Sequence, residues 1–151
     1  MDYSFKDVTV YADSKENLWI VPSGSNERWG GTIEIDIVHH LVPPYSHYDL
    51  GIMLMTAFAE CYSKKYDWNS NRSAIEKFLG VKGYAKAVSG KKLVSISWKQ
   101  GKGYEVTPTK KEQKPKRGYV HMEDKILNLN EQATAEQLGE AVKEAIRIST
   151  S

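Results

Sequence analysis

Side chains able to act as nucleophiles, bases or metal ligands are few in this sequence. It holds one cysteine, Cys61, and four histidines: His39, His40, His47 and His121. No two histidines have the spacing of metal ligands on a helix and no CxxC pair is present, so a zinc site lacks a ligand set. A thiol nucleophile would need a histidine beside it as base, which only the fold could supply. We therefore expect no metal site, structural or surface histidines, and no catalytic residue.

Sequence patterns that bind phosphates or cofactors are also missing. The chain has no Walker loop, no G-x-G-x-x-G pattern and no G-x-S-x-G elbow. The glycines of "KQGKG", residues 99–103, fit a turn between two alternating segments. Cys61 falls on the apolar stripe of a predicted helix, where a buried, unreactive thiol is the usual state. The sequence predicts a protein with no cofactor and no enzymatic activity.

One pair of carboxylates is spaced for joint action. Glu34 and Asp36 alternate with Ile33, Ile35 and Ile37 in "TIEIDIV". If this segment is a strand, the isoleucines face the core and the two acids share the other face, about 7 Å apart. A solvated face is the commoner interpretation of such a pair. The alternative is a docking surface for a positively charged partner.

A basic run, "KKEQKPKR" at Lys110–Arg117, carries five positive charges against the single acid Glu112. Strand-like segments flank it, and it contains no aromatic residue. Proteins that hold single-stranded nucleic acids usually stack bases on aromatic rings, so a solvated loop between two strands is the favoured interpretation. The alternative is a small RNA- or single-stranded-DNA-binding protein that uses residues 110–117, with Tyr104 and Tyr119 as a stacking platform at the base of the loop.

Periodicity predicts the elements that must position these groups. Alternating apolar residues predict strands at "DVTVYADS", "NLWIVPSG", "TIEIDIVHH", "KLVSISWK", "YEVTPT", "GYVHM" and "KILNLN". Helical spacing predicts a long helix in "SHYDLGIMLMTAFAECYSKKY" and a final one in "TAEQLGEAVKEAI". "YAKAV" fits either a helical turn or a strand.

Helix boundaries are marked by capping residues. Ser46 is a plausible N-cap for the long helix, and Gly80 ends a short helix over "AIEKFL". Capping-box pairs open this short helix and the final one: Ser73 with Glu76, and Thr134 with Gln137. The sum is a single α+β domain over residues 1–151, with a largely antiparallel sheet and three to four helices packed on it.

Charge is unevenly distributed along the chain. The net charge is +2, but residues 1–60 carry −6, residues 61–128 carry +10 and residues 129–151 carry −2. Such a division can steer a charged partner if the fold keeps the two signs apart. The chain opens without the apolar core of a signal peptide, and its longest apolar run, Leu50–Ala59, is about half of what a bilayer needs. We expect a soluble cytoplasmic protein with no membrane partner.

Four segments between Ser73 and Ile146, about half the chain, resemble a known family. They are "SAIEKFLGVKGYAKAVSGKKLVSISW", "GYEVTPTK", "GYVHMEDKILNLN" and "TAEQLGEAVKEAI". In this order they resemble the immunity proteins of bacterial contact-dependent growth inhibition (CDI) systems. The "ISW" strand, the "YEVTPTK" strand, the "EDK" step and the "LGEAV" helix carry the likeness.

The resemblance implies a small cytoplasmic protein that is not an enzyme. Such a protein binds the C-terminal toxin domain delivered by a neighbouring cell, often a nuclease, and neutralises it. The family fold is a sheet decorated with helices, and related immunity proteins accept a toxin β-hairpin beside their own strands. Because nuclease toxins are typically basic, the resemblance implies docking on the acidic first sixty residues. Glu34 and Asp36 are the leading toxin-binding candidates, with Trp98 and Tyr104 as the second place to look.

Overall fold

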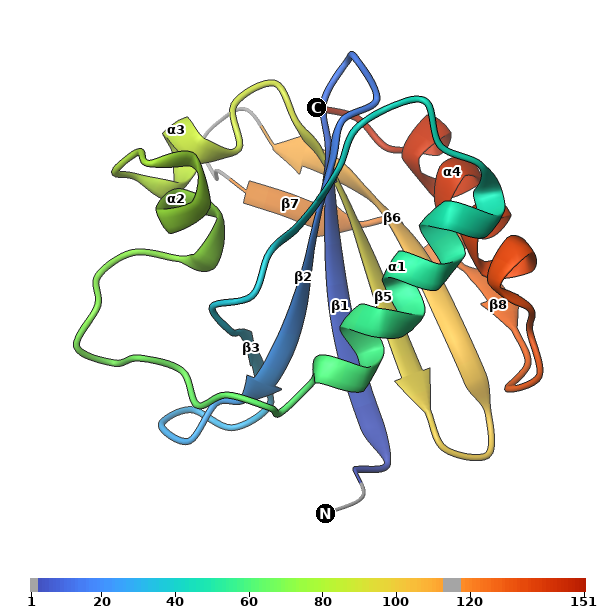
Figure 1. Ribbon diagram of the computed structural model, residues 1–151, viewed down its shortest axis with the longest axis horizontal. Coiled ribbons are helices and arrows are strands. Elements are labelled where there is room, and N and C mark those ends of the chain that lie inside the picture. Colours follow the sequence, from blue (N-terminus) through green and yellow to red (C-terminus); the bar gives the residue numbers. More distant parts are fainter. Residues whose placement is uncertain (1–2, 113–117) are drawn as a thin grey trace.

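The computed structural model describes residues 3–112 and 118–151. This part of the chain forms a single α+β domain, as predicted, in which four helices pack on an antiparallel sheet (Figure 1). Its strands are β1 Phe5–Ala12, β2 Leu18–Ser25, β3 Thr32–Glu34, β4 His39–Leu41, β5 Lys92–Lys99, β6 Gly103–Glu112, β7 Gly118–His121 and β8 Leu127–Leu129. Its helices are α1 His47–Glu60, α2 Ala74–Leu79, α3 Tyr84–Ala87 and α4 Ala135–Ile148, with a 3₁₀ turn η1 at Glu123–Lys125.

The sheet is built from neighbouring antiparallel pairs in the order β3-β2-β1-β5-β6-β7. Short strands complete both edges, because β4 pairs with the start of β2 and β8 pairs with the start of β6. Val8 of β1 lies between Pro22 of β2 and Ile96 of β5. Ile96 in turn faces Val106 of β6, so the predicted alternation places one apolar row across the centre of the sheet.

Helices α1 and α4 cover one face of the sheet and form the main core with it (Figure 1). Leu50 and Leu54 of α1 and Leu138 and Val142 of α4 are fully buried against the central strands. Both helices begin at capping boxes, at Ser46 and Thr134, and the box at Thr134 was predicted. The two longest helices are therefore positioned by an apolar stripe and by a local signal for the start of the helix, both visible in the sequence.

Helices α2 and α3 cover only part of the opposite face. Tyr11, Trp19 and Val21 lie on that side of β1 and β2 and pack against Ile75 of α2 and Val88 after α3. The predicted capping box between Ser73 and Glu76 opens α2, and Gly80 ends it in the left-handed conformation. The ambiguous "YAKAV" segment forms α3. None of the helices described is long and apolar enough to cross a membrane.

Two predicted segments differ from the structure. "TIEIDIVHH" is not one strand: β3 ends at Glu34, the chain leaves the ladder, and pairing resumes at β4. Ile35 is fully buried, whereas Ile33 and Ile37 are only half-buried. The basic run is not all loop either, because Lys110–Glu112 belong to β6 and pair with β7. The rest of that run, residues 113–117, lies outside the described residues.

Candidate partner-binding surface

Cys61 has the structural role that its position on the helix predicted. It caps the C-terminal end of α1 and is 8% exposed. Its Sγ donates to the carbonyl oxygens of Asp7, at 3.3 Å, and of Ala57, at 3.6 Å. Burial raises the pKa of the thiol, which lowers the thiolate fraction and hence the nucleophilicity.

The histidines occupy separate places. His39 pairs with Glu60 at the end of α1, and His40 stacks on Trp19 with ring centroids 4.8 Å apart. His121 is exposed and 4.0 Å from a carboxylate oxygen of Glu123. Over residues 3–112 and 118–151, no three His, Cys, Asp or Glu side chains gather in a way that could hold a metal ion.

The sequence pattern predicted that Glu34 points outward from a strand into solvent. In the structure its carboxylate lies against tyrosine side chains instead. The Tyr11 hydroxyl donates to its two carboxylate oxygens at 2.9 and 3.1 Å, and the Tyr84 hydroxyl lies 2.8 Å from that of Tyr11. This chain of polar groups ties β3 through β1 to α3. Burial raises the pKa of Glu34 to about 7, and the hydrogen bond from Tyr11 only partly offsets it.

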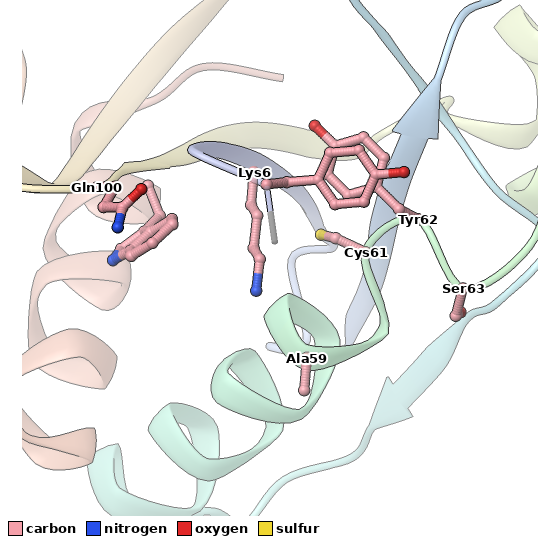
Figure 2. A pocket seen from close by; sticks show the side chains of 8 residues that line it. Lys6, Ala59, Cys61, Tyr62, Ser63 and Gln100 are labelled. Atoms are coloured by element: carbon pink, nitrogen blue, oxygen red, sulfur yellow. The ribbon is translucent and has the colours of Figure 1, made fainter. Parts of the chain in front are cut away.

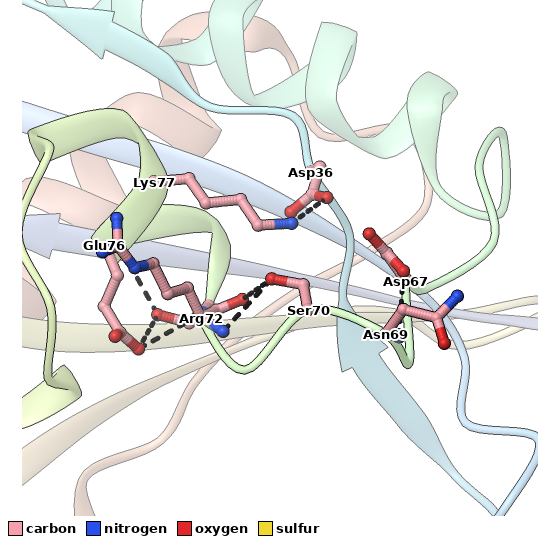
Figure 3. Close-up of polar contacts among 8 residues, drawn as sticks. Asp36, Asp67, Asn69, Ser70, Arg72, Glu76 and Lys77 are labelled. Carbon is pink, nitrogen blue, oxygen red and sulfur yellow. Dashed lines mark hydrogen bonds and ion pairs between the residues drawn. The ribbon is translucent and has the colours of Figure 1, made fainter.

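Asp36 lies beyond the end of β3 and points elsewhere. Its Oδ2 is 2.6 Å from Nζ of Lys77 on α2 (Figure 3). The predicted same-face carboxylate pair is therefore wrong in its geometry: one acid is drawn into a tyrosine cluster, and the other forms an ion pair with a helix. The reason is the break in the strand after Glu34, which ends the alternation that the prediction assumed.

Several other acids within residues 3–60 form hydrogen bonds in different parts of the molecule. Asp7 accepts a hydrogen bond from Thr32 at 2.8 Å, and Glu16 accepts one from Lys143 of α4 at 2.7 Å. Asp49 completes the capping box of α1. These three acids lie on different elements, and each already has a hydrogen-bond partner.

Trp98 and Tyr104 do lie together. They are cross-strand partners on β5 and β6, and Lys6 of β1 faces Trp98 from the other side, so the three form one row. The row follows the fully buried row of Val8, Ile96 and Val106 and marks the end of the core on the helix-covered face. The Lys6 amine lies 5.5 Å from the centre of a Trp98 ring. The structure does not bring this pair of candidates to Glu34 and Asp36.

Beside this row a pocket of about 490 Å³ opens at the C-terminal end of α1 (Figure 2). Lys6, Trp98 and Gln100 line one part of it, and Tyr62, stacked on Tyr3 at 3.6 Å, lines another. We call it the Lys6 pocket. Sequence reasoning identified Trp98 only. The other residues come from distant segments, and only the pairing of β1 with β5 places Lys6 beside the indole.

The stacking platform proposed for the basic run is only half present. Tyr119 pairs with Lys111, whose amine lies 5.4 Å from the centre of its ring. Tyr104 lies at the opposite end of β6, roughly 25 Å from Glu112 at strand spacing. The two tyrosines therefore cannot flank the same loop, which weakens the nucleic-acid interpretation.

Comparisons with known proteins bear on the fold. No family model matches the sequence, and no curated protein sequence matches it. A solved structure of a protein of unknown function from Neisseria meningitidis matches with a TM-score of 0.73 and 14% identity, covering 99% of this chain and 100% of that one. A chain of the CdiA-CT/CdiI toxin and immunity complex from Yersinia pseudotuberculosis matches with a TM-score of 0.70 and 14% identity, covering 98% and 99%. The chain therefore has a fold found in a CDI toxin and immunity complex.

Proposed function

We propose that this protein is an immunity protein that binds the toxin domain of a CDI system and neutralises it without chemistry of its own. The observation that carries the proposal is the similarity of fold, over 98% of this chain, to a chain of a toxin and immunity complex. The resemblance of residues 73–146 to immunity proteins supports the protective role rather than the toxic one. The toxin is a nuclease in this proposal, and neutralisation takes place in the cytoplasm.

The state of the reactive side chains supports the same role. A toxin domain needs a nucleophile, base or metal that reaches its substrate. Here the Cys61 thiol donates to two backbone carbonyls, and His39 is held by Glu60. Exposed aromatic groups, by contrast, are enriched in surfaces that bind another protein.

Co-expression in bacteria tests this function. The proposal expects a large exoprotein to be encoded beside this protein, and the C-terminal domain of that exoprotein is the toxin to test. We expect cells that express this domain alone to stop growing and cells that also express this protein to grow normally. A toxin domain from an unrelated CDI system is the control and should remain toxic, because immunity is specific to its partner. Growth arrest that this protein does not relieve would contradict the proposal.

A further inference from the structure

Lys6 is a half-buried residue whose ammonium group has no described carboxylate partner. It lies in β1 at the wall of the Lys6 pocket, and its side chain extends toward the last turn of α1 near Ala59 (Figure 2). Among residues 3–112 and 118–151 the Lys6 side chain takes part in no hydrogen bond or ion pair, whereas Lys77, Lys99 and Lys143 each have a carboxylate. A cation at the wall of a pocket attracts anions, so this pocket is suited to an anion.

The walls determine which kind of anion fits. Trp98 lies under the Lys6 amine on one side, and the stacked rings of Tyr62 and Tyr3 stand on the other. Gln100 adds an amide to the lining. Three N–H donors of Lys6 and the two of the Gln100 amide can bind carboxylate oxygens, while the rings offer apolar contact to a short methylene stem. These are the needs of an acidic side chain.

The site is held in place before any ligand arrives. The Tyr62 hydroxyl donates to the carbonyl oxygen of Phe5 at 2.6 Å, and the Tyr62 amide donates to that of Ser23 at 3.0 Å. The backbone N–H of Gln100 donates to the carbonyl oxygen of Ser4 at 2.9 Å. Because these contacts fix the backbone of three segments, little conformational entropy is lost when a ligand binds in the pocket.

The pocket also lies where a large partner can reach it. The ends of the β2–β3 and β5–β6 hairpins lie at the same end of the molecule as the C-terminal end of α1 (Figure 1, bottom). In the β2–β3 hairpin Trp29 is 82% exposed. An exposed tryptophan at the same end of the molecule as a pocket lined by aromatic rings and a lysine has the composition of a protein-binding surface.

We propose that the Lys6 pocket receives an aspartate or glutamate side chain of the toxin domain, whose carboxylate pairs with Lys6 while its stem contacts Trp98 and Tyr62. This assignment rests on the proposed immunity function and specifies its docking chemistry. The partner surface is thus acidic at this point, although a nuclease toxin is basic as a whole. A localised acid that meets a localised cation fixes orientation, which is how charged pairs give specificity.

Three variants test the pocket by titration calorimetry against the purified toxin domain. Lys6→Met keeps the stem over Trp98 and removes the charge, and we expect it to weaken binding about thirtyfold or more. Lys6→Glu should weaken binding further. Lys102→Met, in the exposed turn at the same end of the sheet, is the matched control and should bind like the wild type. Circular dichroism and thermal melting establish that each variant is folded.

A double-mutant cycle identifies the partner acid. Each Asp and Glu of the toxin domain is changed to Ala and titrated against the wild type and Lys6→Met. The partner is the acid whose loss weakens binding to the wild type but has little further effect on Lys6→Met. Wild-type binding with an unchanged affinity of Lys6→Met would overturn the pocket and leave the immunity function standing. No binding of the wild type would overturn both.

Calorimetry with free glutamate separates a protein partner from a small carboxylate. We expect free glutamate to bind the wild type far more weakly than the toxin domain does, because it lacks the rest of the interface. Binding of free glutamate that Lys6→Met loses, together with equal binding of the toxin domain by both proteins, would overturn the protein partner in favour of a small carboxylate.

Discussion

The environment of Glu34 in the structure differs from the one that its sequence pattern predicts. On the sequence it is one of two acids on the wet side of a strand. In the structure its carboxylate accepts a hydrogen bond from the hydroxyl of Tyr11. That hydroxyl in turn contacts the hydroxyl of Tyr84, which lies fifty positions after Glu34 in the sequence. A carboxyl group in such a site favours its neutral form, because burial penalises the charge more than one hydrogen bond repays.

The pKa of Glu34, raised to about 7, makes stability depend on pH. Between the unfolded value of 4.5 and about 7, the folded state keeps a proton that the unfolded state loses. The stabilisation from this group is therefore complete below pH 4.5 and is lost as the pH rises through 7. We expect Glu34→Gln to gain stability relative to the wild type by about 1–3 kcal/mol as the pH rises from 5 to 8.

Urea unfolding of both proteins at several pH values measures this difference. Glu140→Gln, an exposed acid of α4, is the matched control for the change from acid to amide. A stability difference between Glu34→Gln and wild type that stays constant with pH would contradict the assignment.

At the scale of elements, the segment around β3 shows how one buried residue anchors an irregular edge. Ile35 is fully buried, and its amide donates to the carbonyl oxygen of Pro22 at 3.0 Å just after the strand ends. Ile35→Ala should lower the free energy of unfolding by about 2–5 kcal/mol, because it leaves a cavity in the core. Ile37→Ala, at a half-buried site, should cost less. A loss below about 0.5 kcal/mol for Ile35→Ala would mean that the site collapses or is not packed.

The crossing of α1 and α4 depends on two glycines. A Cβ added at Gly51 would overlap the carbonyl oxygen of Ala135, and one added at Gly139 would overlap that of His47. Gly→Ala normally stabilises a helix, so the sign of the effect is diagnostic. We expect Gly51→Ala to destabilise the protein by about 1–3 kcal/mol or more in thermal unfolding. Thr56→Ala, exposed on α1, is the control. Stabilisation by Gly51→Ala would contradict this close approach.

Elements that depend on local signals were predictable from the sequence. Short-range pairs such as Ser73 with Glu76 mark the starts of helices. The alternation of serines with apolar residues in β5 indicates which side of that strand faces the core. The break after Glu34 was not predictable, because the apolar alternation continues through it. The Lys6 pocket could not be predicted either, since it requires the register of β1 against β5. Register is a long-range property that local pattern does not contain.

At the scale of the whole molecule, the fold rearranges the charge that the sequence divides into blocks. Acids of the first sixty residues meet cations from later segments, as Glu16 does with Lys143 and Asp36 with Lys77. Docking on the acidic first sixty residues stays a prediction, and the structure shows that its two leading residues, Glu34 and Asp36, already contact Tyr11 and Lys77. The Lys6 pocket offers a partner the opposite sign of charge. With 14% identity to its structural neighbours, the chain shares their fold while its surface contacts must be its own.

The basic run gives a prediction at this scale. We expect protection against the toxin to survive when its five cations are replaced by Ser or Gln: Lys110, Lys111, Lys114, Lys116 and Arg117. Lys110 and Lys111 belong to a strand at the far end of β6 from the Lys6 pocket. Growth assays test protection, and binding of single-stranded RNA at several salt concentrations tests the rival function. Salt-sensitive RNA binding by the wild type that this variant loses would favour a nucleic-acid-binding protein.

The most direct test of the account is a titration of the purified toxin domain with this protein, followed both by heat and by the toxin's own activity. An immunity protein predicts a one-to-one complex with a dissociation constant on the order of nanomolar. The toxin's activity should fall to zero at one equivalent, with no turnover by this protein alone. Absence of heat together with undiminished toxin activity at excess protein would contradict the central claim.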